Sequence, residues 1–323
     1  LIEESPMPRI ALLTTGGTIA MTASDKGANL GAPPPFVEML RRNLPKIGVE
    51  LTPVLSRPST SFTVSDIARL AHAANEVAKT HDGVVITHGT DVLEETAFAL
   101  ELLTRTETPI VVTGAMRLAN KPSADGDANL IAAVRVAASD AARGKGVLVV
   151  FDDEIHWGVL AKKRHAFRTH AFSSEPLGPL GWVAEDRVRF VLTPETRLPH
   201  LSWGGRESVV PILEAGPGLE PDLIRNFPKC DALVLSLPGA GHIADSAPAL
   251  LAELPMPVVF ASRTGAGETL SKSYGYGGGE MDLIARGLIP AKYLDARRAR
   301  IAVAILLSGG ASKEKIAEFF ASI

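Results

Sequence analysis

Short motifs in the first half of the chain place threonine, aspartate and glycine at the ends of predicted strands. Thr14–Thr18 reads TTGGT and His88–Asp91 reads HGTD, and each directly follows an apolar run. Ligands of open α/β sheets bind beyond the carboxyl ends of the strands, so these residues face the expected substrate position. A threonine hydroxyl is a weak nucleophile that needs a neighbouring base. Lys162 or Lys163, in a predicted loop, can be that base if partial burial lowers its pKa.

Each of these features also has a purely structural interpretation. Gly16 and Gly17 allow the chain to turn sharply after a strand without any chemistry. Asp91 can cap the helix that follows it, with Glu94 three residues later completing a capping box. His88 is expected to be a structural residue at a strand end, and the lysine pair can be a solvated basic cluster.

Composition and missing motifs exclude several classes of function. The net charge of −3 argues against a nucleic-acid platform, and the single Cys230 cannot form an internal disulfide or a multi-thiolate zinc site. The eight histidines show no metal-ligand spacing, and the glycine motifs match neither a dinucleotide fingerprint, a P-loop nor a G-x-S-x-G elbow. No uncharged apolar run reaches ~18 residues, and no basic region opens the chain, so a cytoplasmic location is expected.

Alternating strands and helices must position these residues in the first half of the chain. The predicted strands are Arg9–Thr15, Val49–Leu55, Gly83–His88, Pro109–Thr113 and Val147–Asp152. The predicted helices are Asp66–Thr80 with Ser65 as N-cap, Val92–Thr104 and Asn129–Ala142. Such alternation is typical of an α/β fold with a parallel sheet and right-handed crossovers.

The pattern changes in the second half of the chain. Trp182–Leu192 alternates like a hairpin, and Pro194–Glu207 lacks periodicity. The strands predicted beyond it are Ala232–Leu237 and Pro257–Ser262, and the helices are Ala247–Leu254, Ala296–Leu307 and Ser312–Ser322. We therefore expect a larger N-terminal catalytic domain over 7–193, a linker over 194–207 and a smaller C-terminal α/β domain over 208–323.

Four longer motifs in a fixed order resemble the bacterial L-asparaginase and glutaminase-asparaginase family. They are TTGGTIA (Thr14–Ala20), VITHGTDVLEETA (Val85–Ala97), VTGAMR (Val112–Arg117) and SADGDANL (Ser123–Leu130). The resemblance implies a two-domain α/β enzyme, usually a homotetramer of intimate dimers, whose active sites combine two subunits. It also implies hydrolysis of the side-chain amide of L-asparagine through an acyl-enzyme, with no metal or cofactor.

The resemblance assigns catalytic roles to residues that match the family motifs. Thr18 is the expected nucleophile, and Thr90, Asp91 and Lys163 form a second catalytic cluster, with Lys162 as the rival lysine. Asp91 is also expected to bind the α-ammonium group of the substrate. The expected substrate-binding residues are Gly17, Ser59, Thr60, Gly89, Asp91, His242 and Glu280, the last contributed across the dimer.

One departure from the family pattern concerns a tyrosine. The family usually carries one on the loop after the first motif, but Met21–Pro35 contains none. Tyr274 and Tyr276 lie just before Glu280, and we expect one of them, Tyr274 in preference, to serve Thr18. Turn packing in a glycine-rich loop is the plain alternative for both. The Met21–Pro35 loop is expected to be mobile and to close over the substrate.

Three functional interpretations follow from this pattern. The first is an L-asparaginase with lower activity on L-glutamine, since one methylene is usually worth only ~1–3 kcal/mol of discrimination. His242 is expected to narrow the side-chain end of the pocket and favour asparagine. The second is a catalytically weak amino-acid-binding homologue, because the loop tyrosine is missing. The third, the ammonia-producing subunit of a tRNA-dependent amidotransferase, normally has an extra N-terminal domain and is least favoured.

Overall fold

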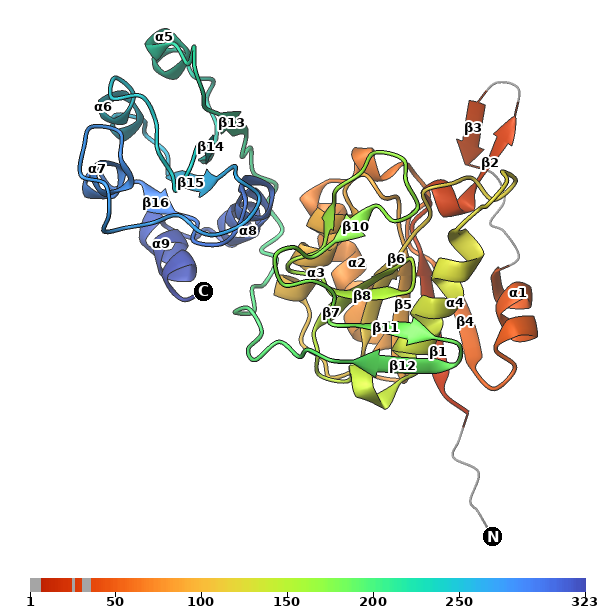
Figure 1. Ribbon diagram of the computed structural model, residues 1–323. Helices are drawn as coiled ribbons and strands as arrows, with labels where there is room; N and C mark the ends of the chain where they lie inside the picture. The colour runs from red at the N-terminus through yellow and green to blue at the C-terminus, as the bar shows by residue number, and fades with distance from the viewer. Residues whose placement is uncertain (1–6, 25–26, 31–35) are drawn as a thin grey trace. The chain divides into compact units, whose positions relative to one another are not determined.

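The chain folds into two compact α/β units (Figure 1). The computed structural model describes residues 7–24, 27–30 and 36–323. The first unit is Leu1–His200 and the second is Leu201–Ile323, so the division falls within the predicted linker over 194–207. In these described ranges, no helix has the length and apolar character needed to cross a membrane.

A mixed eight-stranded sheet organises the first unit, in the order β12-β11-β8-β7-β6-β5-β1-β4. Its strands are β1 (Arg9–Thr14), β4 (Gly48–Pro53), β5 (Gly83–Thr87), β6 (Ile110–Thr113), β7 (Val147–Phe151), β8 (Glu154–Trp157), β11 (Gly181–Ala184) and β12 (Arg187–Phe190). Five neighbouring strands, β7, β6, β5, β1 and β4, are parallel. Strands β8, β11 and β12 extend the sheet beyond β7 in antiparallel pairs. The hairpin around Glu185 was predicted. Strand β8 was not, because it has only four residues and follows the end of β7 after Asp152 and Asp153.

Helices cover this sheet and supply its core. They are α1 (Phe36–Asn43), α2 (Val64–Val77), α3 (Leu93–Leu103) and α4 (Gly126–Ala137), with 3-10 turns η1 (Thr18–Ala20), η2 (Ser59–Ser61) and η3 (Asp140–Ala142). Helices α1 and α4 pack on the face that presents Ile10, Leu12 and Val85. Helix α3 is buried along its whole length against β6 and β7, and α2 packs beside it. Burial on both faces explains why β5 and β7 read as continuous apolar runs.

Several predicted boundaries in this unit were wrong. The N-cap of α2 is Thr63, which forms a capping box with Asp66, so Ser65 lies inside the helix. Asp91 does not cap α3: the N-cap is Val92, with no side-chain hydrogen bond. Helix α4 begins at Gly126 and ends at Ala137, and the rest of the predicted segment forms η3.

Two short antiparallel pairs lie outside the main sheet. Strand β2 (Met21–Ser24) pairs with β3 (Gly27–Leu30), and β9 (Lys162–Lys163) pairs with β10 (Phe172–Ser173). The lysines predicted to lie in a loop are therefore in a two-residue strand. The predicted mobile loop overlaps β2 and β3; residues 25–26 and 31–35 of it lie outside the described residues, so its closure stays a prediction.

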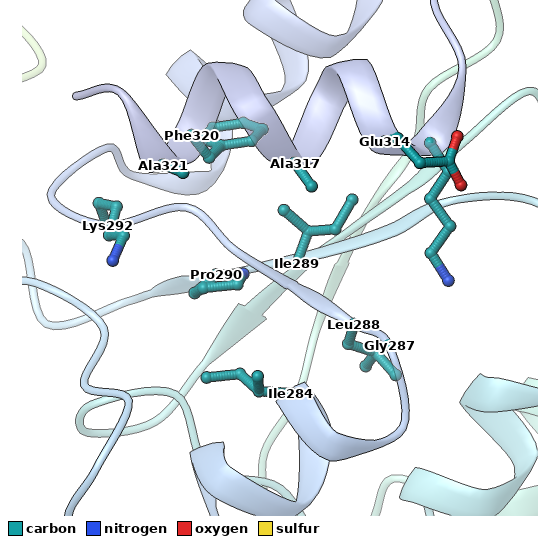
Figure 2. Close-up of a pocket in the computed structure, with 11 residues that line it drawn as sticks. Ile284, Gly287, Leu288, Ile289, Pro290, Lys292, Glu314, Ala317, Phe320 and Ala321 are labelled. Atoms are coloured by element: carbon teal, nitrogen blue, oxygen red, sulfur yellow. The ribbon is translucent and has the colours of Figure 1, made fainter.

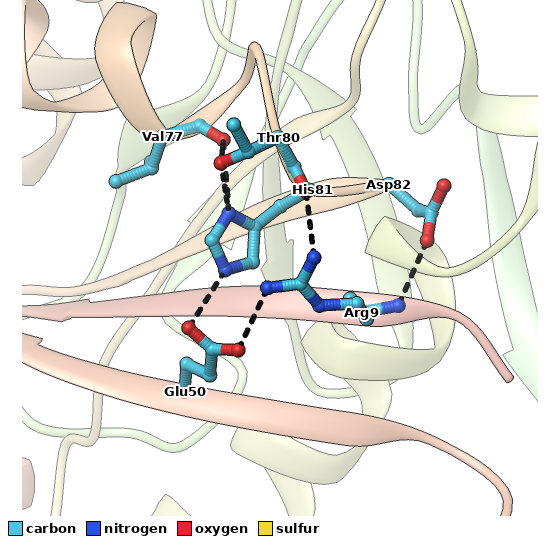
Figure 3. A network of polar contacts seen from close by, with 6 residues as sticks. All are labelled: Arg9, Glu50, Val77, Thr80, His81 and Asp82. Carbon is cyan, nitrogen blue, oxygen red and sulfur yellow. Dashed lines mark hydrogen bonds and ion pairs between the residues drawn. The ribbon is translucent and has the colours of Figure 1, made fainter.

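A polar network ties together the amino ends of β1 and β4, at the edge of the sheet away from the TTGGT turn (Figure 3). Arg9 Nη2 lies 2.9 Å from Glu50 Oε1, and His81 Nε2 lies 3.3 Å from Glu50 Oε2. The backbone N–H of Arg9 donates to Asp82 at 2.8 Å. The hydrogen bond from Arg9 is the main cause that lowers the pKa of the Glu50 carboxyl group. The side chains of Arg9 and Glu50 are more than half exposed, although that of His81 is 8% exposed, so the Arg9–Glu50 ion pair contributes little to stability.

A four-stranded parallel sheet organises the second unit, in the order β13-β14-β15-β16. Its elements are β13 (Ile212–Glu214), α5 (Pro221–Arg225), β14 (Leu233–Leu237), α6 (Pro248–Ala252), β15 (Val258–Ser262), α7 (Glu280–Ala285), β16 (Ile289–Pro290), α8 (Ala296–Ser308) and α9 (Lys313–Ala321). The two central strands were predicted, as were helices α6, α8 and α9. The edge strands and α5 and α7 were missed; each is six residues or shorter, and so short a segment rarely shows a period.

Candidate active site

The turns after β1 and β5 meet backbone to backbone. A Cβ atom built on Gly17 would lie 2.5 Å from the Cα atom of Gly89, so no side chain fits there. Gly17 also has a φ of 84°, which favours glycine. Thr15 holds the two strand ends together, since its hydroxyl donates to the Thr87 carbonyl oxygen at 2.8 Å. The glycines of TTGGT and HGTD are thus required by this close approach.

Ser59 joins the same contact from η2. A Cβ atom on Gly89 would lie 2.6 Å from Ser59 Oγ and 2.8 Å from its Cβ. Ser59 is buried, with 4% exposure. Thr60, its predicted partner in binding the substrate, is instead exposed on the turn. The structure therefore brings Gly17, Gly89 and Ser59 together and leaves Thr60 at the surface.

Thr18 follows this contact as the first residue of η1 and is half-buried. Its position beyond the carboxyl end of β1 matches the edge where α/β sheets bind ligands.

Thr90, Asp91 and Lys163 form one hydrogen-bonded cluster. Lys163 Nζ lies 2.8 Å from Thr90 Oγ1 and 2.8 Å from Asp91 Oδ1. Thr90 is buried and the Lys163 side chain is 15% exposed, whereas the Asp91 side chain is 63% exposed. An ammonium group thus links a buried hydroxyl to a carboxylate that is open to a ligand. Lys163, rather than Lys162, makes these two contacts.

A fourth residue of this cluster was not predicted to act there. Glu94, in the first turn of α3, accepts a hydrogen bond from the backbone N–H of Lys163 at 2.6 Å. Glu94 is 2% exposed. In the sequence it had been interpreted as half of a capping box with Asp91. The only sequence signal for another role was the presence of two further carboxylates, Glu95 and Glu101, in a largely apolar helix.

The two remaining motifs form a support behind the HGTD turn. Asp125 accepts hydrogen bonds from the backbone N–H groups of Met116 at 2.9 Å and Arg117 at 2.8 Å. Asn129 donates to the Gly114 carbonyl oxygen at 3.0 Å. A Cβ atom on Gly114 would lie 2.4 Å from the His88 carbonyl oxygen. The motifs VTGAMR and SADGDANL therefore buttress the turn that carries Thr90.

His88 has the geometry of a structural residue. Burial lowers its pKa to about 4, so the ring is neutral at neutral pH. Its Nδ1 lies 2.7 Å from the Gly89 carbonyl oxygen, which can only accept, so Nδ1 carries the proton. Phe62 contacts the ring edge to face, with the centroids 4.9 Å apart.

The remaining predicted residues form a cluster in the second unit. Glu280 begins α7 and has no exposed surface. Its Oε1 accepts the backbone N–H groups of Ser273 at 2.8 Å and Tyr274 at 2.9 Å. Burial alone would raise the pKa of Glu280, but these backbone donors outweigh it and lower the pKa. The carboxylate is thus held as an anion.

His242 faces the other oxygen of Glu280. Its Nε2 lies 3.4 Å from Glu280 Oε2, and neither atom has a hydrogen-bond partner among the described residues. The His242 ring contacts Tyr274 and Tyr276, with centroids 4.7 and 5.7 Å away. Both tyrosines are about half exposed, so the aromatic rings flank a buried carboxylate whose second oxygen has no hydrogen-bond partner in the described part of the chain.

An apolar groove of about 450 Å³ lies elsewhere in the second unit, between α7, β16 and α9 (Figure 2). Ile284, Ile289 and Phe320 line it, with Lys292 and Lys313 among its polar residues. None of the predicted site residues lines this groove. Within the described residues, no group of three or more His, Cys, Asp or Glu side chains is arranged to hold a metal ion.

Known protein families match the sequences of both units. Residues 9–196 match the family described as "Asparaginase, N-terminal", and residues 209–320 match "Glutaminase/Asparaginase C-terminal domain". A probable L-asparaginase of Deinococcus radiodurans is 38% identical over 97% of both chains. A glutaminase-asparaginase of Pseudomonas fluorescens biotype A is 34% identical over 83% of this chain and 71% of its own length. L-asparaginase 2-3 of Saccharomyces cerevisiae is 29% identical over 99% of this chain and 92% of its own. The chain therefore belongs to the asparaginase family, with both the N-terminal and the C-terminal domain of that family.

Proposed function

We propose that this protein hydrolyses the side-chain amide of L-asparagine to L-aspartate and ammonia, with lower activity on L-glutamine. The names of its relatives support this class of reaction. The observation that carries the proposal is the contact of Lys163 Nζ with both Thr90 Oγ1 and Asp91 Oδ1, each at 2.8 Å. It places a group that can move a proton beside a hydroxyl and an open carboxylate.

In the proposed reaction, Thr18 is the nucleophile. Its Oγ1 attacks the amide carbon and gives up its proton, the C–N bond breaks, and the nitrogen leaves with that proton as ammonia. The resulting ester on Thr18 is then attacked by water, which restores the hydroxyl and releases the free carboxylate. Thr90 positions the water, and Lys163 in its neutral amine form accepts the proton of the water through the Thr90 hydroxyl, since a hydroxyl hydrogen-bonded to an amine forms a short proton path.

The charges of an amino-acid substrate fit the remaining groups. The exposed Asp91 carboxylate and the buried Glu280 carboxylate bind the α-ammonium group. Ser59 binds the α-carboxylate, assisted by Thr60 and by backbone N–H groups of the Gly17 and Gly89 turns. The same backbone groups are the proposed oxyanion donors, because donors fixed before reaction stabilise developing charge best.

We further propose that Glu280 and His242 come from a second copy of the chain, in a dimer that forms part of a tetramer. The buried Oε2 of Glu280, which has no hydrogen-bond partner among the described residues, supports a polar partner at that point. Mixing inactive Thr18→Ala and Glu280→Gln proteins after partial dissociation tests the shared site. Reassembled mixed dimers regain activity if each site uses two chains, and stay inactive if each chain builds its own. The cytoplasmic location stays a prediction.

Tyr274 is the proposed partner of Thr18 in proton transfer. Its ring contact with His242, and thereby with Glu280, supports a place at the substrate. Tyr274→Phe and Tyr276→Phe, assayed separately for ammonia release, identify the tyrosine involved. Full kcat in both variants would show that neither phenol takes part in the reaction.

Parallel steady-state assays on L-asparagine and L-glutamine test the function as a whole. We expect ammonia release from both, with the higher kcat/KM for asparagine because His242 shortens the pocket. Tight binding of aspartate without turnover of either amide would instead identify a catalytically weak amino-acid-binding homologue. Calorimetric titration with aspartate, carried out on the same preparation, distinguishes that outcome from misfolded protein.

A further inference from the structure

A buried carboxylate connects the strand that carries the lysine to the helix that follows the threonine. Glu94 is the second residue of α3, and its Oε2 lies 2.6 Å from the backbone nitrogen of Lys163. Thr90 and Asp91 immediately precede the same helix. Glu94 therefore joins the start of α3 to β9, as the contacts of Lys163 Nζ with Thr90 and Asp91 do. It does so through the backbone of Lys163 rather than through its side chain.

The hydrogen bonds of β9 explain why this contact matters. Strand β9 pairs with β10 on one edge only, where the N–H of Arg164 donates to the Ala171 carbonyl oxygen at 2.6 Å. Successive N–H groups of a strand point to opposite sides, so the N–H of Lys163 points away from β10. Glu94 receives it there and takes the place of a second neighbouring strand.

The chemistry of the contact suits an anchor. A carboxylate that accepts a backbone N–H forms a charge-assisted bond, about twice as strong as a neutral one. The first turn of a helix also favours a negative charge, which offsets part of the cost of burying Glu94. Anchoring the backbone of Lys163 fixes the point from which its side chain extends, so that Nζ can reach both Thr90 and Asp91.

We propose that Glu94 is a positioning residue: it holds the backbone of Lys163 so that Nζ meets Thr90 and Asp91. The expected changes in kcat rest on the proposed amidohydrolase function, whereas the expected position of the Lys163 side chain does not. Glu94 does not touch the substrate; it acts through Lys163.

Helix α3 supplies a matched control. Glu101 is equally buried on the same helix, and its Oε2 accepts the backbone N–H of Val147 at 2.7 Å. Glu94→Gln and Glu101→Gln both remove a buried charge that accepts a strand N–H, but β7 carries no lysine. Glu101 also pairs with Arg197 at 2.8 Å, so Glu101→Gln is the more disruptive change and a stringent control. We expect Glu94→Gln to lower kcat about tenfold with KM nearly unchanged, because a tenfold loss corresponds to losing the charge assistance of one bond. Glu101→Gln should lower the unfolding temperature while kcat stays near wild type.

A double-mutant cycle separates positioning from general loss of structure. In a Lys163→Met background, Glu94→Gln should cause no further loss of kcat, since the group it positions is gone. Equal fold-losses with and without Lys163 would overturn the inference. If Glu94→Gln does not fold, Glu94→Asp takes its place in the cycle, because it keeps the charge but withdraws the oxygen from Lys163.

A readout without activity completes the test. Acetic anhydride labelling of the native protein, followed by peptide mass spectrometry, measures the reactivity of Lys163 itself. Labelling of Lys163 should rise severalfold in Glu94→Gln and stay at the wild-type level in Glu101→Gln. Unchanged labelling together with unchanged kcat would overturn the inference. A wild-type protein that releases no ammonia but shows this labelling difference would overturn only the proposed function.

Discussion

The variant Gly89→Ala tests whether the close contact of Gly17, Gly89 and Ser59 positions groups that bind the substrate. The Cβ of Gly89→Ala would lie 2.6 Å from Ser59 Oγ. Ordinary contacts of this kind begin near ~3.5 Å, so Ser59 must retreat by about 0.9 Å. A displacement of ~1 Å of a group that orients substrate costs on the order of 10²-fold in rate. We therefore expect kcat/KM for asparagine to fall about 10²-fold.

The stability of Gly89→Ala should change far less than its activity. Overpacking by one methyl group costs ~1–3 kcal/mol, which a two-domain protein of this size tolerates. Gly48→Ala is the matched control, because its Cβ would lie 3.6 Å from its nearest neighbour, the Pro8 carbonyl oxygen, at the amino end of the same sheet. Kinetics and urea unfolding are measured on both variants. A Gly89→Ala protein with kcat/KM within about twofold of wild type would refute the reasoning, since it would mean that Ser59 can move freely.

Three further predictions concern the lysine, the buried histidine and the ion pairs. Lys163→Met should lower kcat by ~10²–10⁴-fold while Lys162→Met retains activity; equal losses would mean that the observed contacts do not select the lysine. The pKa of His88 is lowered from 6.5 to about 4, so the unfolded state binds a proton in this range that the folded state does not. The contribution of His88 to the unfolding free energy should therefore fall by about 3 kcal/mol as pH falls from 6.5 to 4, and urea titrations of His88→Asn should show a pH slope smaller by that amount. Arg197→Met leaves the buried Glu101 without its partner and should cost ~3–5 kcal/mol of unfolding free energy, whereas Glu50→Gln in the exposed Arg9 network should change it little.

The strands and helices that position the site could be predicted because each has a strong local signal. The buried strands β1, β5, β6, β7, β14 and β15 are apolar runs bounded by turn residues. The helices α8 and α9 start at Asp295 and Ser312, side chains that do cap them. Several of the shortest elements were missed, among them β8, β9 and α7, because two to six residues are too few to establish a periodic pattern. Their pairing is set by tertiary contacts that no local pattern records.

The candidate site shows the same division. Thr18 and Thr90 could be placed at the sheet edge because each follows a strand. The lysine pair was a candidate base from the sequence, but only the family resemblance selected Lys163 over Lys162. Nothing local shows that Glu94 bonds to a residue 69 positions away. Asp91 and Glu94 have the spacing of a capping box, yet both carboxylates contact Lys163, because a tertiary cation and a strand N–H are stronger partners than the helix end.

The central claim is that a threonine ester forms during turnover, and its site can be measured directly. Wild-type protein is mixed with asparagine, quenched in acid during steady-state turnover and digested, and the peptides are weighed by mass spectrometry. We predict one β-aspartyl group on the peptide that contains Thr18, a larger ester fraction in Lys163→Met if the second cluster activates water, and none in Thr18→Ala. Two results would contradict the account while wild type releases ammonia: an ester on the peptide that contains Thr90, or no ester in both wild type and Lys163→Met.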